Sequence, residues 1–214
     1  MRYVQLICKF SAVLLLTLST INGSGHPAQA SFQSLWAQIV NSPPPAPVRR
    51  GGSRGGYFCQ VAPERGSAVW SDHPTLVWKG SVARVELVTD DLTTTLWNKD
   101  ITADQIASAA IESEYQTYRV TAEAALRSGQ TYRWRIYQSL VEEPFTIPFQ
   151  TLSVQKKQRV EAELPTDATL QRANIFAKLQ LWSDFWYEVL TIEQPSTEVT
   201  QMVEVAFTQL CPNS

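Results

Sequence analysis

The chain has 214 residues, of which 44% are hydrophobic and 18% charged, with 18 Lys and Arg against 20 Asp and Glu. This composition is that of a globular domain with appendages and excludes a disordered or fibrous chain. Twelve Pro, nine Gly and seven Trp fit a β-rich body with marked linkers better than a helical bundle. Two His in the whole chain disfavour a metal site or a catalytic triad built on histidine.

Residues 1–30 have the order of a secretory signal peptide. Arg2 and Lys9 supply a basic start, residues 10–18 form an apolar run, and Ala28-Gln29-Ala30 is an A-x-A cleavage site. A membrane anchor would need about 20 apolar residues, which is longer than this run. We therefore expect cleavage after Ala30 and export to the periplasm or the extracellular space, with no transmembrane span in the mature chain.

Cleavage would remove two basic residues and no acidic one, which leaves 16 basic and 20 acidic residues and a net charge of about −4. That modest charge argues against nucleic acid as a partner. Cys8 and His26 leave with the peptide, so Cys59, Cys211 and one histidine, His73, remain. Two cysteines in an exported protein predict a Cys59–Cys211 disulfide; two buried free thiols and an intermolecular bridge are the alternatives.

Residues 31–56 are predicted to precede the main fold as an amphipathic segment and a linker. The apolar residues form one face of a helix of two or three turns: Phe32, Leu35, Trp36 and Ile39. So short a helix is marginal in water alone and needs a surface on which to dock. The proline-rich run 43–47 then forms a stiff spacer, and the Arg/Gly-rich run 49–56 a flexible one. Three Arg in the second run could contact an anionic surface, but a solvated linker is the preferred interpretation.

Residues 57–152 are predicted to form a β-sandwich of about seven strands, because β-favouring runs recur there at intervals typical of that fold. The runs are 57–61, 75–78, 82–89, 93–97, 115–120, 131–137 and 145–152. In the run 131–137, Tyr132, Trp134 and Ile136 alternate with two Arg, which predicts one buried and one solvated face. Residues 102–114 interrupt the series, as helix or as loop.

Leu126 and Tyr132 point to the type of sandwich. Tyr132 follows Leu126 by six residues, and a turn containing Gly129 lies between them. This arrangement resembles the tyrosine corner of fibronectin type III and related immunoglobulin-like domains. The resemblance implies that the Tyr132 ring fills the edge of the core while its hydroxyl bonds to upstream backbone. The predicted fold class is therefore mainly β, an immunoglobulin/fibronectin III-like antiparallel sandwich with an α-helical appendage.

Residues 153–214 are predicted to form that appendage, a C-terminal helical hairpin. A short charged helix over 156–164 is expected to end at Pro165. One longer helix, capped by Asp167 or Thr166, is expected because apolar residues recur at helical spacing: Ile175, Leu179, Trp182, Trp186 and Val189. A break at Pro195 separates it from a second helix, which Ser196 can cap.

Several motifs, in this order, resemble a known family, the cyanobacterial exported proteins grouped as "domain of unknown function" 928. The matching pieces are the Arg/Gly-rich run before Cys59, His73-Pro74-Thr75-Leu76-Val77-Trp78, Gly129-Gln130-Thr131-Tyr132-Arg133-Trp134 and Leu181-Trp182-Ser183-Asp184. The chain departs from the pattern at Ser183, where an aromatic residue is expected, and in the insert 102–114. The resemblance implies a cyanobacterial source and an exported product, and it carries no activity and no catalytic residue.

The sequence contains none of the common catalytic motifs. G-x-S-x-G, P-loop and G-x-G-x-x-G sequences and zinc-type His/Cys clusters are all missing, so no catalytic residue, cofactor or metal is predicted. His73 is interpreted as a polar residue in a turn. Acid pairs at 90–91, 112/114 and 142–143 leave a carboxylate-based hydrolase as the weaker alternative.

Trp70 and Trp97 are the two tryptophans of residues 57–214 whose burial the sequence pattern does not explain. An exposed pair could stack on sugar rings, which makes a carbohydrate-binding module the main alternative function. The preferred hypothesis is a non-enzymatic interaction or structural module of the cell envelope. Its partner would be an envelope protein or a polysaccharide.

Overall fold

A computed structural model gives the fold of the chain. It describes residues 49–51, 57–101, 115–119, 124–141, 143–166 and 168–211. The predicted signal peptide, the amphipathic segment that follows it, and the insert 102–114 lie outside these ranges.

Two β-sheets form the body, so the prediction of a mainly β chain with a helical appendage is confirmed. The inner sheet has the order β1-β2-β4-β7 and consists of β1 (Arg49–Gly51), β2 (Tyr57–Ala62), β4 (Thr75–Gly80) and β7 (Tyr115–Arg119). The outer sheet has the order β3-β9-β8-β5-β6 and consists of β3 (Ala68–Val69), β5 (Arg84–Thr89), β6 (Thr95–Asp100), β8 (Thr131–Tyr137) and β9 (Phe145–Thr151). All pairs are antiparallel except β3 with β9.

Strand β1 lies inside the run 49–56 that the sequence predicted to be a linker. Its three residues pair with β2, so that Arg49 lies opposite Cys59 and Gly51 opposite Tyr57. The Arg/Gly-rich run therefore begins as an edge strand of the inner sheet. A local pattern with Gly and Arg but no apolar residue does not reveal such an edge strand, because the pairing is made by backbone groups.

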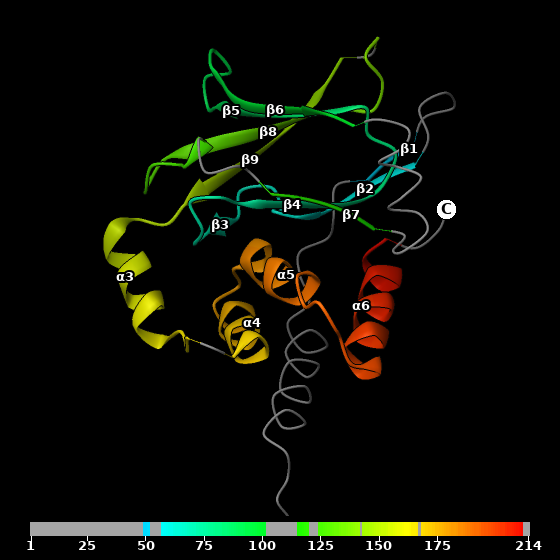
Figure 1. Cartoon of the computed structure of the whole chain (residues 1–214). Coiled ribbons are helices and arrows are strands. Elements are labelled where there is room, and N and C mark those ends of the chain that lie inside the picture. The colour runs from blue at the N-terminus through cyan, green and yellow to red at the C-terminus, as the bar shows by residue number, and fades with distance from the viewer. Residues whose placement is uncertain are drawn as a thin grey trace, which may run out of the picture.

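The inner sheet is covered on both faces, and Figure 1 shows the resulting three layers: outer sheet, inner sheet and helices. On β4, Leu76 and Trp78 belong to the hydrophobic cluster between the sheets, whereas Val77 belongs to the cluster under the helices. Residues 75–79 of this strand are consequently all buried. A strand covered on both faces carries a continuous apolar run, which explains the sequence Thr75-Leu76-Val77-Trp78.

Four helices follow the sheets, one more than the charged helix and the two-helix hairpin that the sequence predicted. They are α3 (Val154–Glu163), α4 (Thr169–Lys178), α5 (Trp182–Leu190) and α6 (Thr197–Leu210). The charged helix near 156–164 and the Ser196 cap of the last helix are confirmed, since the Ser196 hydroxyl accepts a hydrogen bond from the Val199 amide. The predicted cap at Asp167 or Thr166 is wrong: α4 begins after Ala168, and no side chain caps it.

The single helix predicted through Ile175 and Val189 is also wrong, because the chain turns at Gln180. Gln180 has a φ of 58° in the left-handed region. Its amide donates to the Ala177 carbonyl, and the Leu181 amide donates to the Phe176 carbonyl. These two bonds form a Schellman motif, which ends α4 and lets α5 start two residues later in a new direction. Leu179 is exposed at this turn, while Trp182 and Trp186 remain buried as predicted.

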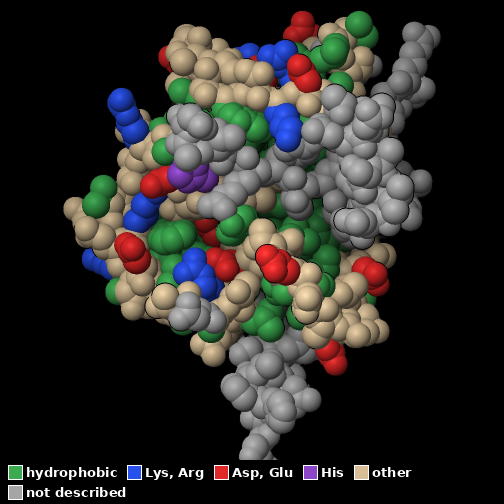
Figure 2. Space-filling model, in the orientation of Figure 1, with side chains coloured by type: hydrophobic (Ala, Val, Ile, Leu, Met, Phe, Trp, Pro, Cys, Tyr) green, Lys and Arg blue, Asp and Glu red, His purple; other side chains and the backbone are tan. Residues whose placement is uncertain are grey.

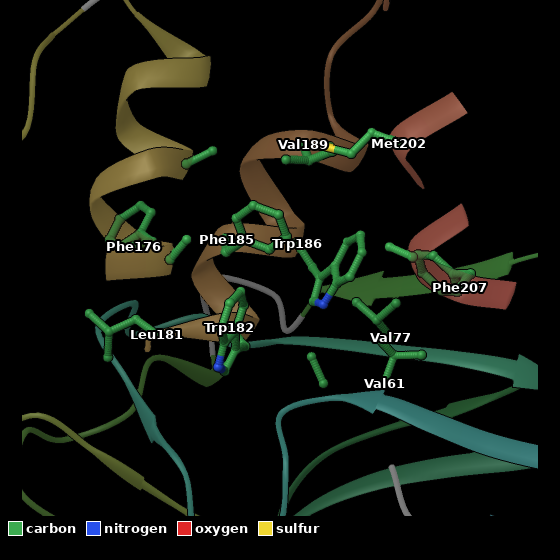
Figure 3. Packing of buried hydrophobic residues seen from close by; sticks show 14 of the residues in the cluster. Val61, Val77, Phe176, Leu181, Trp182, Phe185, Trp186, Val189, Met202 and Phe207 are labelled. Atoms are coloured by element: carbon green, nitrogen blue, oxygen red, sulfur yellow. The ribbon is translucent and has the colours of Figure 1, made fainter. Parts of the chain in front are cut away.

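Figure 3 shows how α5 packs on the inner sheet. Trp186 lies between Phe185 of its own helix and Phe207 of α6, with ring centroids 4.9 and 4.8 Å apart. Val61 and Val77 of the inner sheet lie beneath. On the face that Figure 2 shows, hydrophobic side chains reach the surface between charged ones over the helices. The helical layer is thus held on the sheet by an intramolecular aromatic core.

The Tyr132 hydroxyl bonds to upstream backbone, as the sequence predicted. Tyr132 is 6% exposed, and its hydroxyl accepts a hydrogen bond of 3.0 Å from the Arg127 amide. The Gly129 amide in the same turn donates to the Leu152 carbonyl. The ring itself packs with Phe149 in the core between the sheets.

Replacing Tyr132 by Phe should destabilise the fold by about 1–3 kcal/mol, because the Arg127 amide would lose its acceptor at a part-buried position. Urea denaturation measures this change. Tyr137→Phe is the matched control, since the Tyr137 hydroxyl makes only a long bond of 3.4 Å to Glu86 at a half-buried position. Equal denaturation midpoints for Tyr132→Phe and the wild type would contradict the role of this hydroxyl.

Candidate functional site

The loop Trp70–His73, which joins β3 to β4, lies at a junction of the sheets and helices. Asp184 of α5 reaches this loop: its Oδ2 accepts a hydrogen bond of 2.7 Å from the Trp70 amide, and its Oδ1 one of 2.9 Å from the Ser71 amide. The carboxylate is 4% exposed. Both of its oxygens are therefore used to fasten α5 to a loop more than a hundred residues earlier in the chain.

The first turn of α5 supplies these contacts because three consecutive residues point to different neighbours. Trp182 packs edge-on against Phe185 in the core, with ring centroids 5.5 Å apart. The Ser183 hydroxyl donates a hydrogen bond of 2.8 Å to the Thr75 carbonyl at the start of β4. Asp184 is the third residue of the helix, where a carboxylate is stabilised by the positive end of the helix dipole.

Helices α3 and α4 hold the same loop from other sides. Lys157 of α3 forms an ion pair with Asp72, and its carbonyl accepts a hydrogen bond of 3.3 Å from the Trp70 indole. The Trp70 ring also packs on Phe176 of α4, with centroids 5.5 Å apart. We call Trp70, Ser71, Asp72, Lys157 and Asp184 the loop junction. It joins β3, β4, α3, α4 and α5.

Burial controls the charge of Asp184. Desolvation raises the pKa of its carboxyl to about 6, although hydrogen bonds from the Trp70 and Ser71 amides and the nearby charge of Lys157 act in the opposite direction. Both oxygens already accept backbone hydrogen bonds. The group is consequently arranged as a structural anchor between layers.

Glu64 is a second buried carboxyl, at the corner where the chain passes from β2 to β3. It is 5% exposed, and burial raises its pKa to about 7. The Ser67 amide donates a hydrogen bond to the Glu64 carbonyl. The Gly66 amide, two residues after Glu64, donates to the Pro148 carbonyl of β9. Glu64 therefore lies where the chain leaves the inner sheet and joins the outer one.

Sequence reasoning missed both carboxyls. In the sequence, Asp184 stands out only as part of the motif Leu181-Trp182-Ser183-Asp184. The signal for its burial is Trp182, which lies two residues earlier on an apolar helix face. Glu64 follows Val61, Ala62 and Pro63, so an acid directly after an apolar run was its only signal. For Asp184, the loop that receives the carboxylate comes from a distant part of the chain.

The structure joins Cys59 and Cys211 in a disulfide. Their Cα atoms are 5.9 Å apart, within the usual range for such bonds, and both residues are fully buried. Cys59 lies on β2, and Cys211 directly follows α6. The bond thus ties the last helix to the inner sheet.

Trp70 and Trp97, the candidates for sugar stacking, lie in different parts of the fold. Both are half buried. Trp70 packs against the cluster under the helices, whereas Trp97 on β6 packs edge-on against Trp134 in the core between the sheets, with centroids 6.0 Å apart. The structure therefore does not bring the two indoles together as a pair.

The candidate acid pairs are not assembled into a site within the described residues. Asp90 forms an ion pair of 2.8 Å with Arg133. Hydrogen bonds from Thr89 and Thr93 hold the pKa of Asp91 below its usual value, as in a turn. Glu112, Glu114 and Glu142 lie outside the described ranges. The amide of His73 bonds to the Ser71 hydroxyl, which fits the prediction of a turn residue.

The described residues contain no cluster of three or more His, Cys, Asp or Glu side chains that could hold a metal ion. None of their helices combines the length and the apolar character needed to cross a bilayer.

Comparison with known proteins gives no relative: no family model, no curated protein and no solved structure matches the chain.

The two raised pKa values predict that stability falls as pH rises. Between pH 4.5 and about 7, the folded protein keeps a proton on Glu64 that the unfolded chain has released, so the free energy of unfolding decreases across this window. Asp184 has the same effect between pH 3.8 and about 6. Each group can change the free energy of unfolding by up to about 3 kcal/mol.

Urea denaturation at closely spaced pH values measures this dependence. Glu64→Gln should flatten the part of the curve nearest neutral pH, and Asp184→Asn the more acidic part. Asp184→Asn should also weaken the attachment of α5 to the loop, because one amide oxygen replaces the two that accept from Trp70 and Ser71. A wild-type curve that rises towards neutral pH, or a Glu64→Gln curve with the wild-type slope, would contradict the assignment.

Proposed function

We propose that this protein is exported and serves as a non-enzymatic interaction or structural module of the cell envelope. The observation that carries the proposal is the Cys59–Cys211 disulfide. These are the two cysteines that would remain after cleavage at Ala30, and disulfides persist mainly in oxidising compartments outside the cytoplasm. The basic start, apolar run and A-x-A site of residues 1–30 support the same conclusion.

We also propose that the two sheets form an immunoglobulin/fibronectin III-like sandwich. The hydrogen bond from the Arg127 amide to the Tyr132 hydroxyl supports this type, as does the cluster shared by the two sheets. The resemblance to cyanobacterial exported proteins rests on the order of the motifs and is part of the same proposal. Domains of this class commonly present their loops to partners.

Buried carboxylates support a binding or structural role, because they fasten elements of the fold to one another. Asp184 joins α5 to the loop junction, Glu188 pairs with Arg172 at 2.8 Å, and Glu86 pairs with Arg84 and Arg135. Among the residues that the structure describes, the most exposed apolar side chains lie on the loop between β8 and β9, where Leu140 is 69% and Val141 93% exposed. We propose this loop as the contact with an envelope protein or polysaccharide.

The carbohydrate-binding alternative would require Trp70 or Trp97 to present a ring to a sugar. The packing of Trp70 on Phe176 and of Trp97 on Trp134 favours the interaction module over this alternative. The hydrolase alternative would require two carboxyl groups facing one cavity, and the ion pair of Asp90 with Arg133 disfavours that use of Asp90.

Production of the full chain in a bacterial host with a general export pathway tests the proposal. The mature protein should begin at Ser31, lie outside the cytoplasm, and yield a linked peptide pair holding Cys59 and Cys211 without reduction. Leu14→Arg with Leu15→Arg, which interrupts the apolar run, is the control and should keep the full chain and its free thiols inside. Exported protein with an intact Met1 would contradict the proposal.

The same exported protein, immobilised, then tests the contact loop against purified envelope polysaccharides and envelope proteins. Leu140→Ser with Val141→Ser should abolish the binding that the wild type shows. Leu92→Ser with Leu96→Ser, on the loop and strand after β5, is the matched control because these residues are also exposed. Binding lost through Trp97→Ala but retained in the Leu140/Val141 variant would favour the carbohydrate-binding alternative.

A further inference from the structure

Helix α6 is attached to the rest of the described chain differently from α5. Helix α5 is fastened by polar contacts: Asp184 to the loop junction, Ser183 to β4, and Glu188 to Arg172 of α4. The side-chain hydrogen bonds that Thr200 and Thr208 of α6 make stay within the helix and its cap. Among the described residues, no salt bridge joins α6 to another element.

Buried apolar residues lie along the length of α6. Four of its residues are buried: Val199, Met202, Ala206 and Phe207. Phe207 packs edge-on against Trp186, as Figure 3 shows. The loop 191–196 that connects α6 to α5 is largely exposed. A helix of 14 residues is marginal in water by itself, so its docking depends on what holds it near this surface.

The disulfide attaches the C-terminal end of α6 to the inner sheet. Cys211 is the C-cap residue of α6, and Cys59 lies on β2 beside Val61, which belongs to the cluster that α6 covers. With the bond formed, α6 is tethered at both ends, by the loop 191–196 and by the bond. Tethering both ends raises the effective concentration of the helix at its site and reduces the entropy lost on docking.

We propose that α6 is a cover locked by oxidation, which docks stably on the inner sheet only after Cys59 and Cys211 are joined. In the reduced chain, α6 leaves the sheet while α5 stays in place through the loop junction. The Trp186 ring then loses its contact with Phe207, and the side of the core that α6 covered is open. This inference goes beyond the proposed function, since it concerns how the fold is completed and requires no partner.

Bond formation is a thiol–disulfide exchange with a disulfide oxidant, such as oxidised glutathione. The thiolate of one cysteine attacks the oxidant, forms a mixed disulfide and releases one reduced thiol. The second cysteine then attacks the mixed disulfide, forms the Cys59–Cys211 bond and releases the other. Two protons and two electrons pass from the protein to the oxidant. Once formed, the bond is fully buried, so a reductant reaches it only when α6 opens.

Hydrogen exchange followed by mass spectrometry tests the proposal on two forms of the mature protein. One is oxidised, and the other is reduced in denaturant and refolded with reductant. In the reduced form, peptides from α6 should exchange at least about tenfold faster, while those from α5 and β4 keep their protection. Bis-ANS fluorescence should rise as the apolar residues between α6 and the core become exposed, and Cys59 should react with N-ethylmaleimide under native conditions.

Cys59→Ala with Cys211→Ala should reproduce the reduced form without reductant. Val160→Ala on α3, which removes a buried contact and leaves the bond intact, is the control and should leave α6 protected. Equal protection of α6 with and without the bond would overturn the proposal, because apolar contacts would then suffice. Equal loss of protection in α5, β4 and α6 would also overturn it, because the bond would then support the whole fold.

Discussion

Strand β4 has a hydrophobic core on each of its faces, and both layers that cover it depend on this strand. Leu76 and Trp78 pack towards the outer sheet, and Val77 packs towards the helices. An inner sheet of this kind cannot leave either face in water, because its apolar side chains would then be exposed. The boundary near residue 152 therefore separates types of secondary structure, whereas the core under the helices contains residues from both sides of it.

Polar groups fix the position of the helical layer on that core. Apolar packing is not directional, so it brings α5 to the sheet without selecting one orientation. The Asp184 carboxylate with its two amide donors, and the Ser183 hydroxyl with the Thr75 carbonyl, do select one. Burial of Asp184 disfavours its charge, and the hydrogen bonds offset part of this cost. The loop junction thus contributes specificity more than net stability.

Most strands of the two sheets could be predicted from the sequence, whereas little of the loop junction could. Tyr132 and the alternation in 131–137 are local patterns, and the structure confirms a strand and a backbone bond there. The turn at Gln180 escaped prediction because apolar residues keep a helical spacing across it, and a non-glycine residue takes the left-handed conformation. Asp184 escaped because its partners are amides 114 and 113 residues away, which no local pattern encodes.

Unfolding measured with two probes tests directly whether β4 couples the layers. Far-UV circular dichroism reports mainly on the helices, and tryptophan fluorescence reports largely on the cores. Leu76→Ala removes packing between the sheets and Val77→Ala removes packing under the helices, and each large-to-small change in a core is destabilising. Because both layers share the strand, each variant should lower the urea midpoint equally by both probes, with coincident transitions. A Val77→Ala variant whose helical signal is lost before its fluorescence transition would show that the two layers unfold separately.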